Sequence, residues 1–65
     1  RRDVVAQYVR SRKEKGITQA EQARRAGIPR TNITRFESGD YNPSLEMMVR
    51  IAAALGMKLQ VALVE

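Results

Sequence analysis

The chain has 65 residues, 43% of them apolar and 29% charged, a composition typical of one small globular domain. It contains neither cysteine nor histidine, which excludes disulfides and thiolate metal sites and removes the commonest general base. We therefore expect no metal, cofactor, small-molecule substrate or enzymatic activity. The longest apolar run, Ile51–Leu55, is far shorter than the roughly 20 residues of a membrane span. The lack of cysteine fits a reducing cytoplasm, and the short apolar run leads us to expect no membrane partner.

The positive charge lies mostly in the first half of the chain. Residues 1–35 carry ten basic and three acidic side chains, whereas residues 36–65 carry two basic and four acidic ones. The chain as a whole has a net charge of +5. This asymmetry indicates an anionic partner such as nucleic acid, a lipid surface or an acidic protein, unless the charge only keeps a surface solvated.

Two helices are predicted before Gly27. The first runs from Asp3 to Lys15 and ends before Gly16. Its inward stripe consists of Val5, Tyr8, Val9 and Arg12. The second runs from Thr18 to Ala26, with small inward residues at Ala20, Ala23 and Ala26. Thr18 and Glu21 have the spacing of a capping box, in which the hydroxyl accepts from the Glu21 amide and the carboxylate accepts from the Thr18 amide.

The third predicted helix, from Pro29 to Glu37, has two unlike faces. Proline is tolerated at a first helical position because its missing N–H would have no partner there. The inward stripe is formed by Pro29, Ile33 and Phe36. The opposite face has no large apolar residue and consists of Thr31 and Arg35 at its centre, Thr34 and Ser38 beside them, and Arg30 and Asn32 at its margins.

A turn over residues 40–43 precedes the fourth predicted helix. Ser44 caps this helix, which runs from Leu45 to about Leu55 and ends before Gly56. Its core stripe consists of Leu45, Met48, Ile51, Ala52 and Leu55. Met47 and Val49 lie off this stripe, as dimer surface or as scattered exposed residues.

The last segment changes its period from helical to alternating. Apolar residues occupy positions 57, 59, 61 and 63, which predicts a strand with one buried face. A lone strand cannot satisfy its own backbone groups, and no other segment reads as a strand. The simplest partner is the same segment of a second copy, which makes Leu59, Val61 and Leu63 dimerisation residues. The alternatives are a frayed end or an additional helical turn.

By spacing, the second and third helices form a helix-turn-helix around Gly27 and Ile28. Apolar side chains can pack the two helices across each other, which leaves a polar, cationic face of the third helix at the width of a DNA major groove. A helical hairpin of this kind can also be purely structural.

A longer pattern of residues resembles the phage repressor and Cro family, also called the XRE-type helix-turn-helix family. The match covers residues 8–56 and rests on Arg12, Gly16, Ile17, Thr18, Gln19, Ala23, Gly27, Ile28, Ile33, Phe36, Glu37, Gly39, Pro43, Ser44, Leu45, Ile51, Ala52, Leu55 and Gly56. The resemblance implies an all-α, four-helix, lambda-repressor-like domain over residues 1–56. It also implies sequence-specific binding of double-stranded DNA by a homodimeric transcriptional regulator, most simply a repressor.

The alternating segment 57–65 is in addition similar to the end of HipB-type antitoxins, where a strand pairs across the dimer. This likeness implies a second possible function, in which the domain binds and neutralises a partner toxin and DNA binding serves autoregulation. RNA binding is a further reading of a basic domain, although the stacking aromatic residues of RNA-binding modules are lacking.

The resemblance also implies roles for individual residues. The positions that match the family's base contacts are Arg30, Thr31 and Arg35, with Thr34 beside them. The positions that match phosphate contacts are Gln19, Asn32, Ser38 and Asn42. Gln19 matches a position that can also support a base-reading side chain. Arg12 and Glu37 match an internal ion pair, although each alone could be ordinary surface charge.

Two residues depart from the family pattern. Asp40 stands in a turn where members often carry Lys or Arg, so either the backbone amides or Asn42 supply those DNA contacts, or the contacts are weaker. Gln22 stands where most members carry leucine, so a packing contact is reduced or the site is exposed.

Overall fold

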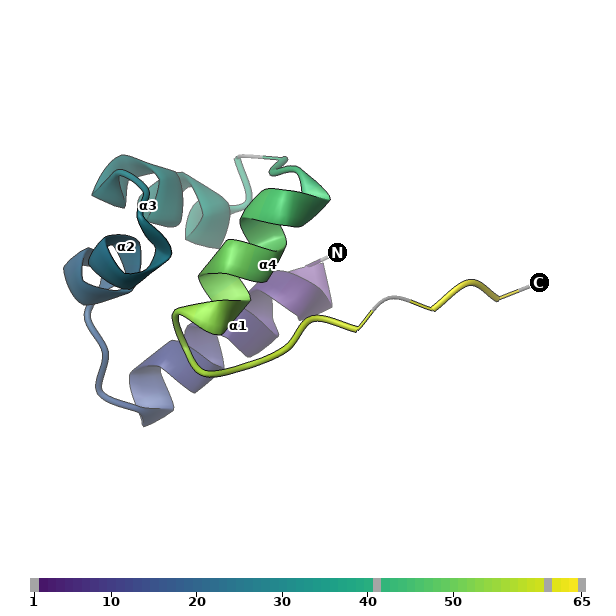
Figure 1. Cartoon of the computed structure of the whole chain (residues 1–65), viewed down its shortest axis with the longest axis horizontal. Coiled ribbons are helices and arrows are strands. Elements are labelled where there is room, and N and C mark those ends of the chain that lie inside the picture. The colour runs from purple at the N-terminus through teal and green to yellow at the C-terminus, as the bar shows by residue number, and fades with distance from the viewer. Residues whose placement is uncertain (1, 41, 61, 65) are drawn as a thin grey trace.

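The computed structural model describes residues 2–40, 42–60 and 62–64 and contains four α-helices in these ranges. They are α1 (Arg2–Glu14), α2 (Gln19–Ala26), α3 (Arg30–Ser38) and α4 (Leu45–Ala53). The helices form a bundle, and the C-terminal segment runs away from it (Figure 1). The predicted all-α, four-helix architecture is confirmed, with each helix boundary within two residues of its predicted place.

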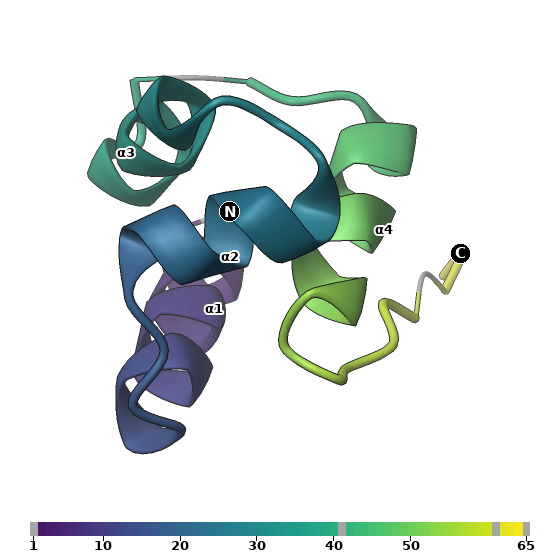
Figure 2. The same cartoon turned by 60° about the vertical axis from the view of Figure 1, so that its left-hand side comes forward.

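Local signals set the starts and ends of the helices. The side chain of Thr18 accepts a hydrogen bond from the Glu21 amide at 3.0 Å, and that of Ser44 accepts one from the Met47 amide at 3.2 Å. Gly27 has a φ of 71°, a left-handed conformation that closes α2 and turns the chain toward α3. Figure 2 shows α3 crossing α2 after this turn, the arrangement of a helix-turn-helix.

One half of the predicted capping box is wrong. The Glu21 carboxylate accepts hydrogen bonds from Arg24 and Arg25 rather than from the Thr18 amide. Guanidinium groups three and four residues later on the same helix face offer charged donors, which bind a carboxylate more strongly than a neutral amide does.

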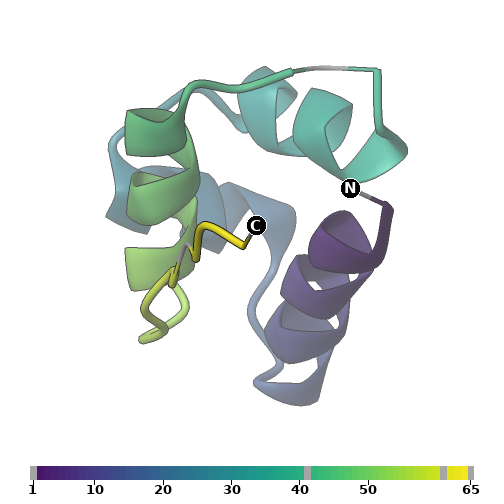
Figure 3. The same ribbon diagram turned by 90° about the vertical axis from the view of Figure 1, so that its right-hand side faces the viewer.

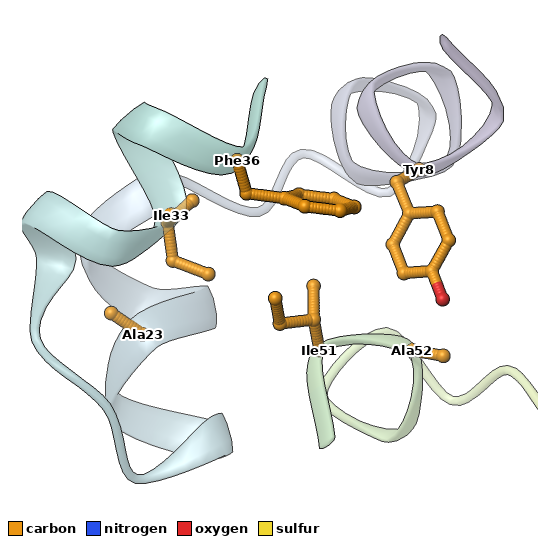
Figure 4. Packing of buried hydrophobic residues seen from close by; sticks show 6 residues of the cluster. All are labelled: Tyr8, Ala23, Ile33, Phe36, Ile51 and Ala52. Atoms are coloured by element: carbon orange, nitrogen blue, oxygen red, sulfur yellow. The ribbon is translucent and has the colours of Figure 1, made fainter. Parts of the chain in front are cut away.

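The core lies where α1, α3 and α4 meet, and α2 closes one side. Its buried residues are Tyr8, Ala23, Ile33, Phe36, Ile51 and Ala52 (Figure 4). The rings of Tyr8 and Phe36 pack edge to face, with centroids 5.0 Å apart. The Tyr8 hydroxyl donates to the Met48 carbonyl at 3.0 Å, so α1 is tied to α4 as well as packed against it.

Several predicted core residues are exposed. Ala20 is exposed because the buried side of α2 is centred on Gln22 and Ala23 instead. Pro29 is exposed because it precedes α3 as its N-cap and is not its first helical residue. Leu45 remains 57% exposed because α4 packs through its C-terminal half, where Ile51 and Ala52 are buried.

Two other residues, Met47 and Gln22, are more buried than the sequence predicted. Met47, predicted to lie off the core stripe, packs partly buried against the core. Gln22 is only 1% exposed, so the reading of it as an exposed site is wrong. Its Nε2 atom lies 3.4 Å from the Ile51 carbonyl oxygen, and its Oε1 atom has no hydrogen-bond partner.

The C-terminal segment forms no strand within the single chain, over residues 57–60 and 62–64. Met57 and Leu59 pack half-buried against the core, and Lys58 and Gln60 between them are exposed. Leu63 is fully exposed, and Val61 lies outside the described residues. Figure 3 shows the segment leaving the end of α4 and running back in front of that helix, with α1 to its right. Its pairing with a second copy stays a prediction.

Candidate nucleic-acid interface

Most of the predicted base-contacting residues lie together on the outer face of α3. We define this outer face as Arg30, Thr31, Thr34, Arg35 and Ser38, all of which are exposed. On the opposite side of the same helix, Ile33 and Phe36 are 0% and 2% exposed. Helical spacing therefore fixes which way the polar residues face, because the core holds the helix by its apolar side.

Gln19, the first residue of α2, joins this face to the body of the domain. Its Nε2 atom donates to Oε1 of Glu37 at 3.0 Å, and its Oε1 atom accepts from the Thr34 hydroxyl at 3.0 Å. The resemblance implied that Gln19 contacts a phosphate and can support a base-reading side chain, but it did not specify Thr34 and Glu37 as the partners. The two hydrogen bonds depend on the angle at which α2 packs against α3, which no local pattern encodes.

Arg12 and Glu37 form an ion pair between α1 and the end of α3. The Nε and Nη2 atoms of Arg12 lie 2.7 and 3.0 Å from the two carboxylate oxygens of Glu37. Each side chain is only 11% exposed. A third hydrogen bond runs from Nη1 of Arg12 to the Ile17 carbonyl at 2.9 Å. Arg12 is therefore part of the internal structure and is not available at the surface.

The remaining predicted phosphate contacts differ in their setting. The Ser38 hydroxyl lies 2.9 Å from the Arg35 carbonyl oxygen and 3.3 Å from Oδ2 of Asp40. Asn42 is exposed in the loop between α3 and α4. Asn32 is half-buried, on the far margin of α3 from Thr34. A carboxylate beside Ser38 disfavours a phosphate at that point, because the two like charges repel.

Arg24 and Arg25 occupy the last turn of α2 and are exposed, with Glu21 as their shared partner. Their hydrogen bonds lower the pKa of the Glu21 carboxyl to about 2. The two side chains thus stabilise the end of α2.

The described part of the chain holds neither a group of three or more acidic, histidine or cysteine side chains suited to a metal ion nor a helix with the length and hydropathy to cross a bilayer. The candidate site is built from cationic, hydroxyl and amide groups. Such groups suit recognition of a polyanion with a patterned edge.

The chain matches the helix-turn-helix family over residues 10–61, and it belongs to this family. The match includes α2, the turn at Gly27 and α3, the elements that form the outer face of α3 and its support. The family predicted from the sequence is thereby confirmed.

Named relatives come from archaea, bacteria and a bacteriophage. An "uncharacterized HTH-type transcriptional regulator" of Methanothermobacter thermautotrophicus is 53% identical over 45 residues, which are 69% of this chain and 65% of that protein. The "ImmF control region 10 kDa protein" of Bacillus phage phi105 is 40% identical over 50 residues, or 77% of this chain and 56% of that protein. The "immunity repressor protein" of the same phage is 38% identical over 48 residues, or 74% of this chain and 33% of that protein.

The chain thus spans less than two thirds of the length of these relatives. None of the three bears the name of an antitoxin, so the narrower likeness to HipB-type antitoxins stays a prediction. No solved structure gives a significant match to the chain.

Proposed function

We propose that this chain binds double-stranded DNA sequence-specifically, as a homodimeric transcriptional regulator that places α3 in the major groove. One observation carries the proposal: the outer face of α3 is exposed, polar and cationic, while Ile33 and Phe36 hold the same helix in the core. An α-helix fits the major groove, where base edges present distinct patterns of donors and acceptors. The names of the archaeal regulator and the phage repressor support the same function.

The roles proposed for the side chains follow from their chemistry. Arg30 and Arg35 donate bidentate hydrogen bonds to O6 and N7 of guanine, and Thr31 contacts the methyl group of thymine. Each good bidentate pair discriminates between bases by about 1–3 kcal/mol. Phosphate contacts by Gln19, Asn32 and Asn42 fix the register of the domain on the duplex.

A homodimer supplies the second half of the reading surface. Two copies of α3 that enter successive major grooves on one DNA face lie about 34 Å apart. The exposed Leu63 and Val64 of the C-terminal segment are apolar residues that a second copy would cover. Light scattering of the purified chain tests this: a dimer that becomes monomeric in the Leu63→Asp variant supports it, and a monomer at all concentrations contradicts it.

The antitoxin function would use similar exposed apolar residues for a different protein. Leu45 and Val49 of α4 are 57% and 47% exposed and lie one helical turn apart. Co-expression with the product of the neighbouring gene tests it. A stable complex that survives purification supports the antitoxin role, and a pure homodimer argues for the regulator alone.

Selection of bound DNA from a random pool, at two salt concentrations, tests DNA reading. The proposal predicts a two-fold symmetric consensus, and Arg35→Ala is expected to relax the preference at one position of each half-site. Arg50→Ala, an equal charge loss on an exposed part of α4, is the control and is expected to keep the consensus. Binding that is blind to sequence and falls steeply with salt would reduce the function to charge attraction.

A further inference from the structure

Four side chains form a continuous hydrogen-bonded path from the inside of the domain to the outer face of α3. They are, in order, Arg12, Glu37, Gln19 and Thr34. The direction of each bond in this path is fixed by chemistry. A guanidinium only donates, so both carboxylate oxygens of Glu37 accept from Arg12.

The carboxylate of Glu37 in turn fixes the orientation of the Gln19 amide. A carboxylate accepts only, so the group facing Glu37 at 3.0 Å must be the NH2 of Gln19. The amide oxygen of Gln19 then points to Thr34, whose hydroxyl must donate to it across 3.0 Å. The opposite orientation of the amide would place two oxygens against each other.

The hydroxyl proton of Thr34 has a second acceptor within the chain, the carbonyl oxygen of Arg30. The hydroxyl oxygen of Thr34 lies 3.3 Å from the carbonyl oxygen of Arg30, one turn earlier on α3. A threonine hydroxyl has a single proton, and both of its neighbours can only accept it. On its exposed side, Thr34 therefore has lone pairs to offer and no proton.

We propose that Thr34 is a specificity-determining residue that accepts a hydrogen bond from an exocyclic amino group of a base, N6 of adenine or N4 of cytosine. In the major groove these two bases present amino donors, whereas thymine and guanine present keto acceptors at the corresponding edge. Because the Thr34 hydroxyl has no available proton, it can accept from the amino group of adenine or cytosine. It cannot donate to the keto oxygen of thymine or guanine. The inference rests on the proposed function and assigns the chemistry of one contact within it.

The test compares Thr34→Val, which replaces the hydroxyl with a methyl group at similar volume, with Thr34→Ser, which keeps the hydroxyl. Random-pool selection with the full chain is expected to yield adenine or cytosine at one position of each half-site. Thr34→Val should lose this preference, and Thr34→Ser should retain it. Circular dichroism of both variants checks that they are folded.

A base analogue then isolates the amino group itself. If the selected base is adenine, its replacement by purine, which lacks the N6 amino group, is expected to weaken binding of the unaltered chain by about 3- to 10-fold. The same replacement should leave binding by Thr34→Val unchanged. If cytosine is selected, a pyrimidinone that lacks the N4 amino group serves in the same way.

Failure of this inference is distinguishable from failure of the proposed function. If Thr34→Val keeps the consensus while Arg35→Ala changes it, or if the base that Thr34→Val ceases to select is thymine or guanine, the inference is overturned and the regulator stands. If the unaltered chain selects no consensus at all, the proposed function fails and the inference with it.

Discussion

Nε and Nη2 of Arg12 meet the two carboxylate oxygens of Glu37 at 2.7 and 3.0 Å, which ties the first helix to the last turn of α3. Because Gln19 donates to the same carboxylate, the support of the proposed DNA-reading helix depends on this pair. The pair therefore links the stability of the domain to the geometry of its outer surface.

Removal of one partner of this pair is expected to destabilise the fold. Arg12→Met leaves the Glu37 carboxylate, with a side chain 11% exposed, without its main donor, and we expect a loss of about 3 kcal/mol of unfolding free energy. Urea unfolding measures it. The double variant Arg12→Met/Glu37→Met is expected to be more stable than Arg12→Met alone, since no charge is then stranded. If Arg12→Met loses less than about 1 kcal/mol of unfolding free energy, the pair contributes no more than an ordinary surface ion pair.

Gln22 offers the opposite experiment, a substitution that stabilises. Its Oε1 atom is buried without a partner, and the hydrogen bond from its Nε2 atom to the Ile51 carbonyl is long at 3.4 Å. Gln22→Leu removes this polar group from the core, and we expect a gain of about 1 kcal/mol in unfolding free energy. Gln7→Leu, at an exposed position of α1, is the control and is expected to change stability little. A destabilised Gln22→Leu would mean that the amide is better satisfied than the geometry indicates.

The response to acid should reveal the cluster around Glu21. Its pKa is about 2 in the folded chain, against an ordinary value of 4.5, because Arg24 and Arg25 bind the carboxylate. A lowered folded-state pKa contributes stability that is complete above pH 4.5 and lost as the pH falls toward 2. Thermal unfolding of the unaltered chain and of Glu21→Gln, measured from pH 7 to 2, should show a gap that closes over this range. Parallel curves would contradict the assignment.

Asp40 is expected to weaken DNA binding. Its carboxylate lies 3.3 Å from the Ser38 hydroxyl, beside the end of the outer face of α3. Asp40→Asn should raise affinity for a selected duplex, and Asp40→Lys should raise it further and steepen the salt dependence by about one unit of slope. Glu14→Gln makes the same charge change at the end of α1 and is the control. Equal affinities of Asp40→Asn and Glu14→Gln would place Asp40 outside the interface.

Those features of the fold that depend on neighbouring residues could be predicted from the sequence. Thr18, Ser44 and Gly27 set helix ends through contacts within a few residues, and the polar face of α3 follows from its spacing. Contacts between different helices of the bundle were harder to predict from the sequence. The exposure of Leu45 and the burial of Gln22 depend on where one helix meets another, which single-helix periodicity does not specify.

The same division applies to the candidate site. The sequence places Thr34 on the correct face, but the hydrogen bond to Gln19 spans 15 positions and needs the folded angle between α2 and α3. In the C-terminal segment, the alternating pattern matches the half-buried Met57 and Leu59. Pairing of that segment with a second copy depends on contacts between two chains, which the alternating pattern of one chain does not specify.

Titration of the isotope-labelled chain with DNA duplexes, followed by NMR of the backbone amides, tests the central claim most directly. With a duplex chosen by selection, the amides of residues 31–35 are expected to shift more than those of the exposed Lys13 and Glu14 at the end of α1. If duplexes of every composition, including a random pool, leave residues 31–35 unmoved while binding occurs elsewhere, α3 does not read DNA.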